Sequence, residues 1–210
     1  MSRLIIHDQG GLYYTTSTVV GWIDIFSRKK YRDIILNSLQ YNIEHKALLV
    51  FAYVIMSNHI HLVLRAGNPQ KWPLWDILRD FKKFTARTIL DTIMKEKESR
   101  RDWLMYMFKY YAKQNTNNRE FQFWQQDNYP VELLNINQVW TKINYIHNNP
   151  VKAGIVDSPE EYIYSSARNY LRNNKGCLLK INLMNPDPNV REVKNDFCVE
   201  DSGLTRTSET

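Results

Sequence analysis

The sequence has few cysteines and no long apolar run, and each absence narrows the possible class of protein. Its two cysteines among 210 residues, Cys177 and Cys198, stand in polar sequence and form neither a disulfide framework nor a zinc ribbon. We expect both to be free thiols. No apolar stretch approaches the ~20 residues that span a bilayer. The segment from Met1 to Gly11 lacks the basic start and apolar stretch of a secretory signal, so we expect a cytoplasmic protein without a membrane partner.

Positive charge is concentrated in one stretch of the chain. The formal net charge is +6, and between Arg79 and Lys113 ten Lys and Arg residues outnumber five Asp and Glu residues. From Met184 to Thr210 acidic residues are in excess instead. A local basic block is the electrostatic pattern of a protein that binds a phosphate backbone. A solvated helix face gives the same pattern, and charge alone favours that plainer interpretation.

Segments with strand-like and helix-like patterns alternate along the chain. Strands are expected at residues 13–26, 47–56, 59–65 and, as a further pair, within 121–134. Helices are expected at residues 31–46, 73–95, part of 96–120, and 137–149. Pro150 should end the last helix, since the residue before proline avoids helical geometry. A final structured unit is expected at 158–171. This order predicts an α+β fold, an antiparallel sheet with helices on one face.

A histidine pair lies in the second strand of an expected hairpin, which turns at Ser57-Asn58. Side chains alternate across a strand, so His59 and His61 share one face while their apolar neighbours point to the other. The apolar side can pack against helices, which leaves the histidines on the uncovered face, close enough to bind one divalent ion. An H-x-H pattern taken alone is weak, because two histidines on a solvated strand face often bind nothing.

A tyrosine lies on the polar side of the helix expected at 137–149. At 100° per residue the apolar stripe consists of Val139, Trp140, Ile143 and Ile146. His147 falls within the stripe and is expected to be a packed core histidine. Tyr145 falls outside it, with Lys142 and Asn149 on the same side. A phenol with its usual pKa of about 10 needs a metal or a cation to act as a nucleophile. An ordinary surface tyrosine is the plainer alternative.

Three segments together resemble one known family. Residues 53–66 read YVIMSNHIHLVLRA, residues 145–156 read YIHNNPVKAGIV, and residues 159–167 read PEEYIYSSA. They resemble the small single-tyrosine transposases of the HUH class, in the branch associated with repetitive extragenic palindromes (REP) of bacterial genomes. The resemblance implies a ferredoxin-like or RRM-like fold. It also implies a transposase domain over residues 1–171 and a C-terminal extension over 172–210, which we expect to be loose beyond about 184.

The resemblance assigns roles to individual residues. His59 and His61 match the histidine pair of the family, and Tyr145 matches its nucleophile. Asn149 stands where relatives carry an amide or similar ligand that completes a site for Mg²⁺ or Mn²⁺. Lys142 would stabilise the phenolate or contact a phosphate group. The DNA backbone contacts implied by the basic helix after the hairpin are Arg79, Lys82, Lys83 and Arg87.

The activity implied by the resemblance is cleavage and rejoining of single-stranded DNA beside a hairpin. Tyr145 would attack the scissile phosphorus, forming a 5′-phosphotyrosine and releasing a 3′-hydroxyl group, with the metal offsetting the charge on the phosphate oxygens. The partner would be single-stranded DNA with hairpins, bound by a nucleoid-associated monomer or homodimer.

Other functions remain open at this stage. A domesticated, non-catalytic protein that binds single-stranded DNA or RNA hairpins should carry substitutions at His59, His61 or Tyr145, and all three are intact. A metal-dependent nuclease that activates water would keep its activity in Tyr145→Phe. An interaction protein with fortuitous motifs is disfavoured because the motifs occur together.

Overall fold

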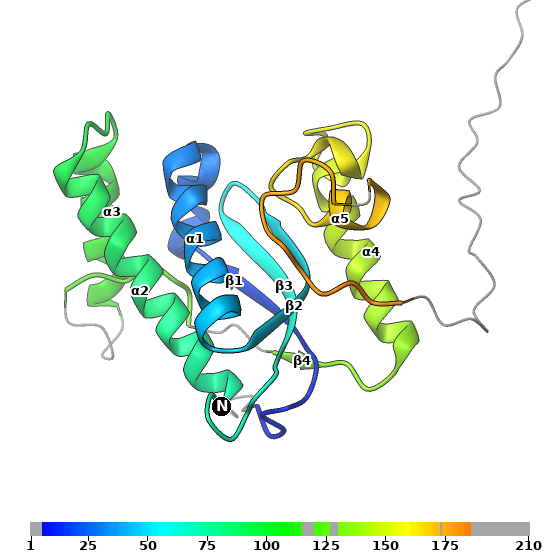
Figure 1. Cartoon of the computed structure of the whole chain (residues 1–210). Coiled ribbons are helices and arrows are strands. Elements are labelled where there is room, and N and C mark those ends of the chain that lie inside the picture. Colours follow the sequence, from blue (N-terminus) through cyan, green and yellow to red (C-terminus); the bar gives the residue numbers. More distant parts are fainter. Residues whose placement is uncertain (1–5, 115–119, 127–129, 173, 186–210) are drawn as a thin grey trace, which may run out of the picture.

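The computed structural model describes residues 6–114, 120–126, 130–172 and 174–185, and it contains a four-stranded antiparallel sheet (Figure 1). The strand order is β2-β3-β1-β4. The strands are β1 (Tyr13–Thr18), β2 (Leu48–Ile55), β3 (His59–Ala66) and β4 (Val131–Glu132). The helices are α1 (Lys29–His45), α2 (Leu74–Lys95), α3 (Arg101–Lys113), α4 (Ile136–Lys152) and α5 (Ala167–Leu171). The predicted α+β class with an antiparallel sheet is confirmed.

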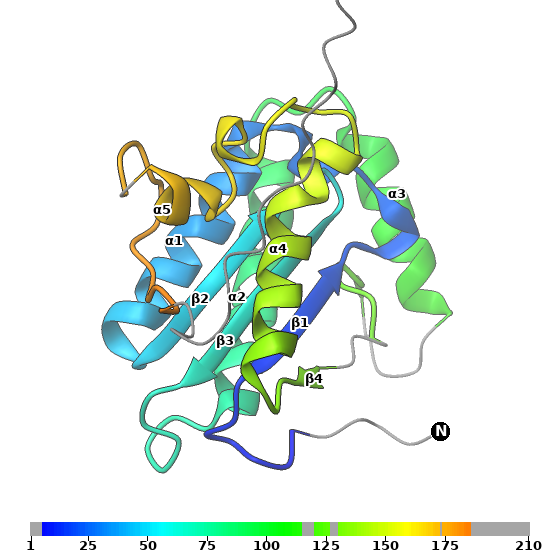
Figure 2. The same cartoon turned by 90° about the vertical axis from the view of Figure 1, so that its right-hand side faces the viewer.

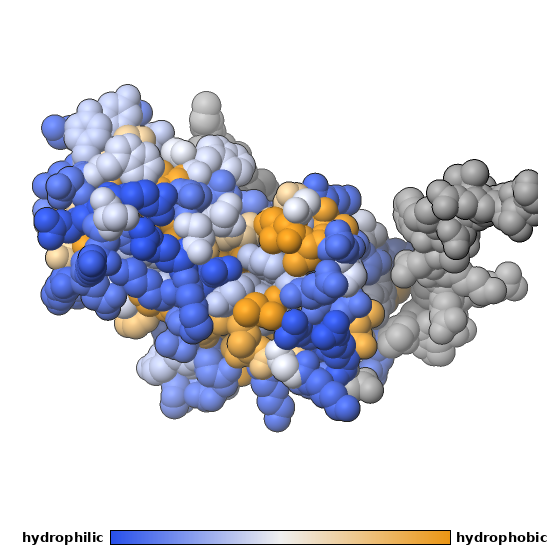
Figure 3. Space-filling model, turned by 90° about the horizontal axis from the view of Figure 1, so that it is seen from above, coloured by the Kyte–Doolittle hydropathy of each residue, from blue (hydrophilic) through white to orange (hydrophobic). Residues whose placement is uncertain are grey.

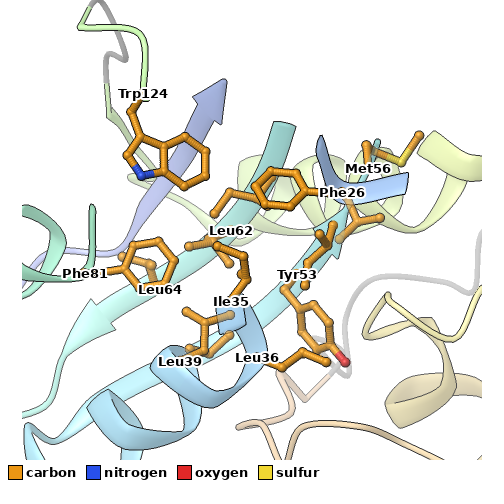
Figure 4. Packing of buried hydrophobic residues seen from close by; sticks show 14 of the residues in the cluster. Phe26, Ile35, Leu36, Leu39, Tyr53, Met56, Leu62, Leu64, Phe81 and Trp124 are labelled. Atoms are coloured by element: carbon orange, nitrogen blue, oxygen red, sulfur yellow. The ribbon is translucent and has the colours of Figure 1, made fainter. Parts of the chain in front are cut away.

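Helices cover both faces of the sheet, and the side chains of each strand point alternately to one face and the other. In β3, Leu62 and Leu64 point toward α1 and α2, which cover the face of the sheet that was predicted to pack against helices (Figure 4). Val63 and His61 point to the opposite face, and α4 lies over that face along β2 and β3 (Figure 2). The structure therefore adds one helix to the face that we expected to stay uncovered.

The main core fills the space between the sheet and the α1–α2 layer. Leu62 and Leu64 meet Ile35 and Leu39 of α1, with Phe81 of α2 beside them (Figure 4). All five side chains are almost fully buried. Each side chain of this size contributes roughly 1.5–3 kcal/mol when it is removed from water. This core holds β3 in place, and with it the histidines on the other face.

The C-terminal unit covers the free edge of β2. The structured segment predicted at 158–171 is present, with a 3-10 turn at Pro159–Glu161 followed by α5. The chain then continues past β2, where Leu179 is buried. Backbone hydrogen bonds join this unit to β2: Ser166 N donates to Tyr53 O, Asn182 N donates to Val50 O, and Ile55 N of β2 donates to Tyr164 O. Residues 186–210, which include most of the tail expected to be loose, lie outside the described residues.

The sequence predicted free cysteine thiols and no membrane-spanning segment. Cys177 is a free thiol in the structure, whereas Cys198 lies outside the described residues. Within the described part of the chain, none of the helices has the length and apolar character needed to cross a membrane.

Two expected strands are shorter than the sequence indicated. The strand predicted at 13–26 ends at Thr18, because Gly21 and Trp22 adopt positive φ angles of 60° and 55° that no strand allows. In the region 121–134, the described residues contain only β4 and an isolated bridge between Trp124 and Val19. Residues 127–129 lie outside the described residues.

The prediction that Pro150 ends the last helix is wrong. Helix α4 continues through Pro150 to Lys152. Gly154, with φ of +67°, then reverses the chain, and its N–H group donates to Val151 O while that of Ile155 donates to Pro150 O. This is the Schellman ending of a helix. Pro150 has no N–H group and cannot bond to the Ile146 carbonyl oxygen, while the carbonyl oxygens of Asn149, Pro150 and Val151 at the end of the helix all accept hydrogen bonds.

His147 is the packed core histidine that the apolar stripe predicted. Its side chain is buried, and its Nε2 atom is 2.9 Å from the Ser166 hydroxyl oxygen. Burial lowers the pKa of His147 to about 4, below the ordinary value of 6.5. The unfolded chain therefore takes up a proton at a higher pH than the folded chain does.

We expect this difference to destabilise the protein in acid. Above pH 6.5 the titration of His147 leaves the free energy of unfolding unchanged. As the pH falls from 6.5 toward 4, that free energy decreases by roughly 2–3 kcal/mol. His147→Gln keeps a hydrogen-bonding group near Ser166 but cannot titrate. Urea unfolding at a series of pH values should show a shallower loss of stability for this variant. Parallel pH profiles for the variant and the original protein would contradict the assignment.

Candidate active site

The register between β1 and β3 brings the histidine pair beside two hydroxyl side chains. His59 is the first residue of β3, and His61 pairs with Thr16 of β1. Tyr14 and Thr16 lie on the same face as His61 because residues i and i+2 of a strand share a face. The two imidazole rings have centroids 4.7 Å apart. The predicted side-by-side placement of the two histidines is therefore present.

His61 is held through its Nδ1 atom. This atom lies 2.8 Å from the Tyr14 hydroxyl oxygen and 2.9 Å from the Thr16 hydroxyl oxygen. The ring is only 5% exposed, and its Nε2 atom is buried without a hydrogen-bond partner among the described residues. Burial, with smaller contributions from His59 and Lys142, lowers the pKa of His61 to about 3. His61 is therefore a neutral imidazole at physiological pH.

His59 is oriented by its neighbour in the hairpin turn. Its Nδ1 atom lies 2.6 Å from the Asn58 side-chain oxygen. An amide oxygen only accepts, so the Nδ1–H group donates and the lone pair of the ring is on Nε2. Asn58 also donates from Nδ2 to the backbone oxygen of Trp22. Burial lowers the pKa of His59. The ring is thus kept neutral and fixed between the turn and Trp22.

Tyr145 approaches the histidines from α4. Its ring centroid is 5.4 Å from that of His61, and the two rings are nearly perpendicular. The buried stripe of α4, which includes Ile143 and Ile146, packs toward the sheet and leaves Tyr145 41% exposed. The predicted position outside the apolar stripe is confirmed. The phenol is reachable from solvent and lies beside the most buried ring of the site.

Two lysines flank the Tyr145 ring. The Nζ atoms of Lys142 and Lys152 are each 5.9 Å from its centroid, and Lys142 is also 4.6 Å from the centroid of Tyr14. Positions i−3 and i+7 fall on the same side of a helix as position i. Lys152 was missed from the sequence because Pro150 was expected to end the helix before it. Two cations beside the ring favour the binding of a phosphate group there.

Tyr14 is a second residue that the sequence did not single out. Burial raises its pKa to about 12, and the adjacent Tyr145 contributes in the same direction. Tyr14 therefore stays protonated, and its oxygen can accept from the Nδ1–H group of His61 in the tautomer that leaves the ring's lone pair on Nε2. The strand alternation that placed the histidines on one face could have identified Tyr14, but only with the β1–β3 register, which the sequence does not supply.

The donor atoms fit a divalent metal in part. The Nδ1–H group of His59 donates to Asn58, and when the Nδ1–H group of His61 donates to Tyr14 or Thr16 both rings carry the lone pair on Nε2, which is how metal-binding histidines are usually held. No cluster of three or more His, Cys, Asp or Glu side chains suited to a metal occurs in the described parts of the chain. Asn149, the expected third ligand, is half-buried one turn beyond Tyr145 on α4. A complete site would need this amide or oxygen ligands from elsewhere.

The structure does not bring the predicted α2 cations to this site. Arg79, Lys82, Lys83 and Arg87 lie on α2, across the sheet from α4 (Figure 2). Arg79 forms ion pairs with Asp76 and Asp80, whereas Lys83 and Arg87 are exposed. Any DNA that contacts both groups must therefore pass around an edge of the sheet.

Lys82 differs from the other cations on α2. It is half-buried and has no ion pair among the described residues. Burial lowers its pKa to about 8. A cation that is poorly solvated and lacks an acidic partner gains more from a phosphate group than an exposed lysine does.

Comparisons with known proteins support the fold. No family model matches the sequence, and no curated protein matches it. Among solved structures, the chain is similar to a REP-associated tyrosine transposase bound to a REP hairpin, with a TM-score of 0.58 and 14% sequence identity. The similarity covers 90% of this chain and 96% of that one. At this identity the similarity shows a common fold across nearly the whole chain.

We expect Lys82→Met to stabilise the protein at neutral pH. Because the folded-state pKa lies below the usual value of 10.5, the cost of the buried charge is fully present below pH 8 and disappears as the pH rises toward 10.5. The variant should therefore gain roughly 1–3 kcal/mol at pH 7 and almost nothing near pH 10. Guanidinium unfolding at the two pH values measures the difference. Lys83→Met is the matched control and should change stability little at either pH.

Proposed function

We propose that this protein cleaves and rejoins single-stranded DNA next to hairpins, with Tyr145 as the nucleophile. The observation that carries the proposal is the meeting of an accessible tyrosine with two neutral histidines that are both held through Nδ1, with the buried Nε2 atom of His61 unpaired among the described residues. The histidines and the tyrosine come from two distant segments of the chain. Taken alone, either the histidine pair or the tyrosine can be explained as ordinary packing. A fold shared with a hairpin-bound tyrosine transposase adds independent support.

The residues proposed to hold Mg²⁺ or Mn²⁺ are His59 and His61, with Asn149 as the third protein ligand. A bound divalent ion would supply Lewis-acid polarisation of the scissile phosphate. Thr16 and Tyr14 would keep the His61 ring turned with Nε2 toward the site, and Asn58 does the same for His59. The protein supplies only two histidines, which leaves coordination positions for phosphate oxygens.

In the proposed step, the Tyr145 phenol oxygen attacks phosphorus and the bond from phosphorus to the 3′ oxygen breaks. The phenolic proton passes to solvent, and the departing oxygen takes up a proton to become a 3′-hydroxyl group. The products are a 5′-phosphotyrosine and a free 3′ end. Lys142 and Lys152 flank the phenol and would offset the negative charge of a phosphate group bound beside it. The ester link preserves the bond energy, so attack by another 3′-hydroxyl group restores a DNA strand without ATP.

The cations on α2 are proposed to bind DNA away from the reaction. Lys82, Lys83 and Arg87 would contact backbone phosphates on the far side of the sheet, and Arg79 would do so only by exchanging its acidic partners. Such contacts position DNA and add affinity without reading its sequence.

A covalent-adduct assay tests the nucleophile. The full-length protein would be mixed with labelled single-stranded hairpins from the DNA flanking its own gene, together with Mn²⁺, and separated on a denaturing gel. We expect a labelled protein band that is lost in Tyr145→Phe. Tyr41→Phe, at an exposed tyrosine on α1, is the matched control and should keep the band.

Each other result would reject the proposal in favour of a specific alternative. Cleavage that persists in Tyr145→Phe would identify a nuclease that activates water. Tight hairpin binding with neither adduct nor cleavage, across several hairpins and metals, would identify a non-catalytic hairpin-binding protein.

Replacing either histidine separates metal chemistry from DNA binding. We expect His59→Gln and His61→Gln to reduce Mn²⁺-dependent cleavage at least about 100-fold, while hairpin affinity changes less than about threefold. His147→Gln, a histidine of α4 that faces the core, is the matched control. Gel shift and cleavage would be measured on the same samples. An equal loss of binding and cleavage would argue against the metal role.

A further inference from the structure

An exposed tryptophan stands directly beside the histidine pair. Trp22 is 62% exposed, and its ring centroid is 6.2 Å from that of His59. Its backbone has a φ of +55°, and that of Gly21 is +60°. Two consecutive left-handed residues are costly for the chain, and the second one carries a bulky side chain. The turn therefore holds a large aromatic ring in solvent at the edge of the candidate active site.

The same turn packs against α3. A Cβ atom at Gly21 would lie 2.6 Å from the Tyr111 hydroxyl oxygen, so only glycine permits this close approach. Tyr111 contacts the neighbouring Tyr110, with ring centroids 5.4 Å apart. Tyr110 in turn is nearly parallel to Tyr106, at 6.4 Å. Aromatic side chains of α3 thus begin where this helix meets the Gly21–Trp22 turn and continue onto its outer surface.

The outer face of α3 carries three exposed aromatic side chains. Trp103, Tyr106 and Tyr110 lie within 60° of one another on the helical wheel, opposite the buried Leu104 and Phe108. Tyr106 is the most exposed of the three, at 65%. None of the described residues covers this face of α3. Exposed aromatic rings gathered in this way are usually buried within a protein or contact a binding partner.

Positive charge borders the aromatic face. Lys109 and Lys113 are exposed on one side of it and form no ion pair with the described residues. Figure 3 shows side chains of intermediate hydropathy gathered among strongly hydrophilic ones on the left, where α3 lies in Figure 1. Exposed rings bordered by lysines suit an unpaired nucleic-acid strand, since bases stack on the rings while the phosphates meet the cations.

We propose that Trp22, Trp103, Tyr106 and Tyr110 form a stacking track for the unpaired strand that extends from the active site. The inference rests on the proposed function, because it takes single-stranded DNA as the substrate. It assigns a role to α3, for which neither the motifs nor the reaction gives one. The contact from Gly21 to Tyr111 links the track to the site, so a strand that leaves the histidines passes Trp22 before it reaches α3.

The test compares a DNA hairpin that carries a single-stranded extension of about eight nucleotides with the same hairpin lacking it. The extension contains 2-aminopurine, whose fluorescence falls when it stacks. In the full-length protein, Tyr106→Ala/Tyr110→Ala should weaken binding of the extended hairpin about tenfold and restore the fluorescence. Binding of the hairpin without the extension should stay within about twofold.

Two controls isolate stacking. Tyr106→Phe/Tyr110→Phe keeps both rings and should behave as the original protein does. Tyr41→Ala removes an equally exposed tyrosine from α1 and should change neither affinity nor fluorescence. If the double alanine variant lost its fold, Tyr106→Ala alone would give the same comparison at the most exposed ring.

The outcomes distinguish the track from the reaction. Equal affinity of the double alanine variant and the original protein for the extended hairpin would overturn the track, even with an intact Tyr145 adduct. Equal affinity of the original protein for both hairpins would also overturn it. Loss of extension binding in the alanine variant, in a protein that forms no adduct, would support the track and reject the proposed reaction.

Discussion

The pairing of β1 with β3 is the constraint on which the candidate site depends. It sets Thr16 opposite His61 and Tyr14 two residues away, so that hydroxyl groups fix the ring that has the least contact with water. The same pleat turns Leu62 and Leu64 into the core under α1 and α2. A shift of one residue would exchange the two faces, burying the apolar side chains under α4 and pointing the histidines into the core.

The local features of the site could be predicted from the sequence. The hairpin, the shared face of His59 and His61, and the exposure of Tyr145 all follow from periods of 2 and 3.6 residues, which operate over a few neighbours. The relation between the two motifs required a family resemblance, because no local pattern says which helix crosses which face of a sheet. For the same reason α4 was not expected over the histidine face.

The remaining differences come from tertiary context. Pro150 ends a helix in an isolated peptide, but here a glycine turn caps the last carbonyl groups and α4 extends far enough to place Lys152 beside Tyr145. The basic residues of α2 were grouped by their position in the sequence, whereas the sheet separates them from Tyr145. Trp22 was assigned to a strand, because the composition around it suits β structure and a single glycine does not reveal a left-handed turn.

The covering of β2 determines how two copies of this chain could associate. An uncovered edge strand offers its backbone to another molecule, which would extend the sheet from one subunit into the next. Here the C-terminal unit already occupies Val50, Tyr53 and Ile55 on that edge. A continuous sheet across two subunits is therefore blocked on the β2 side, so that a homodimer has to be built from helices, loops or the short β4 edge.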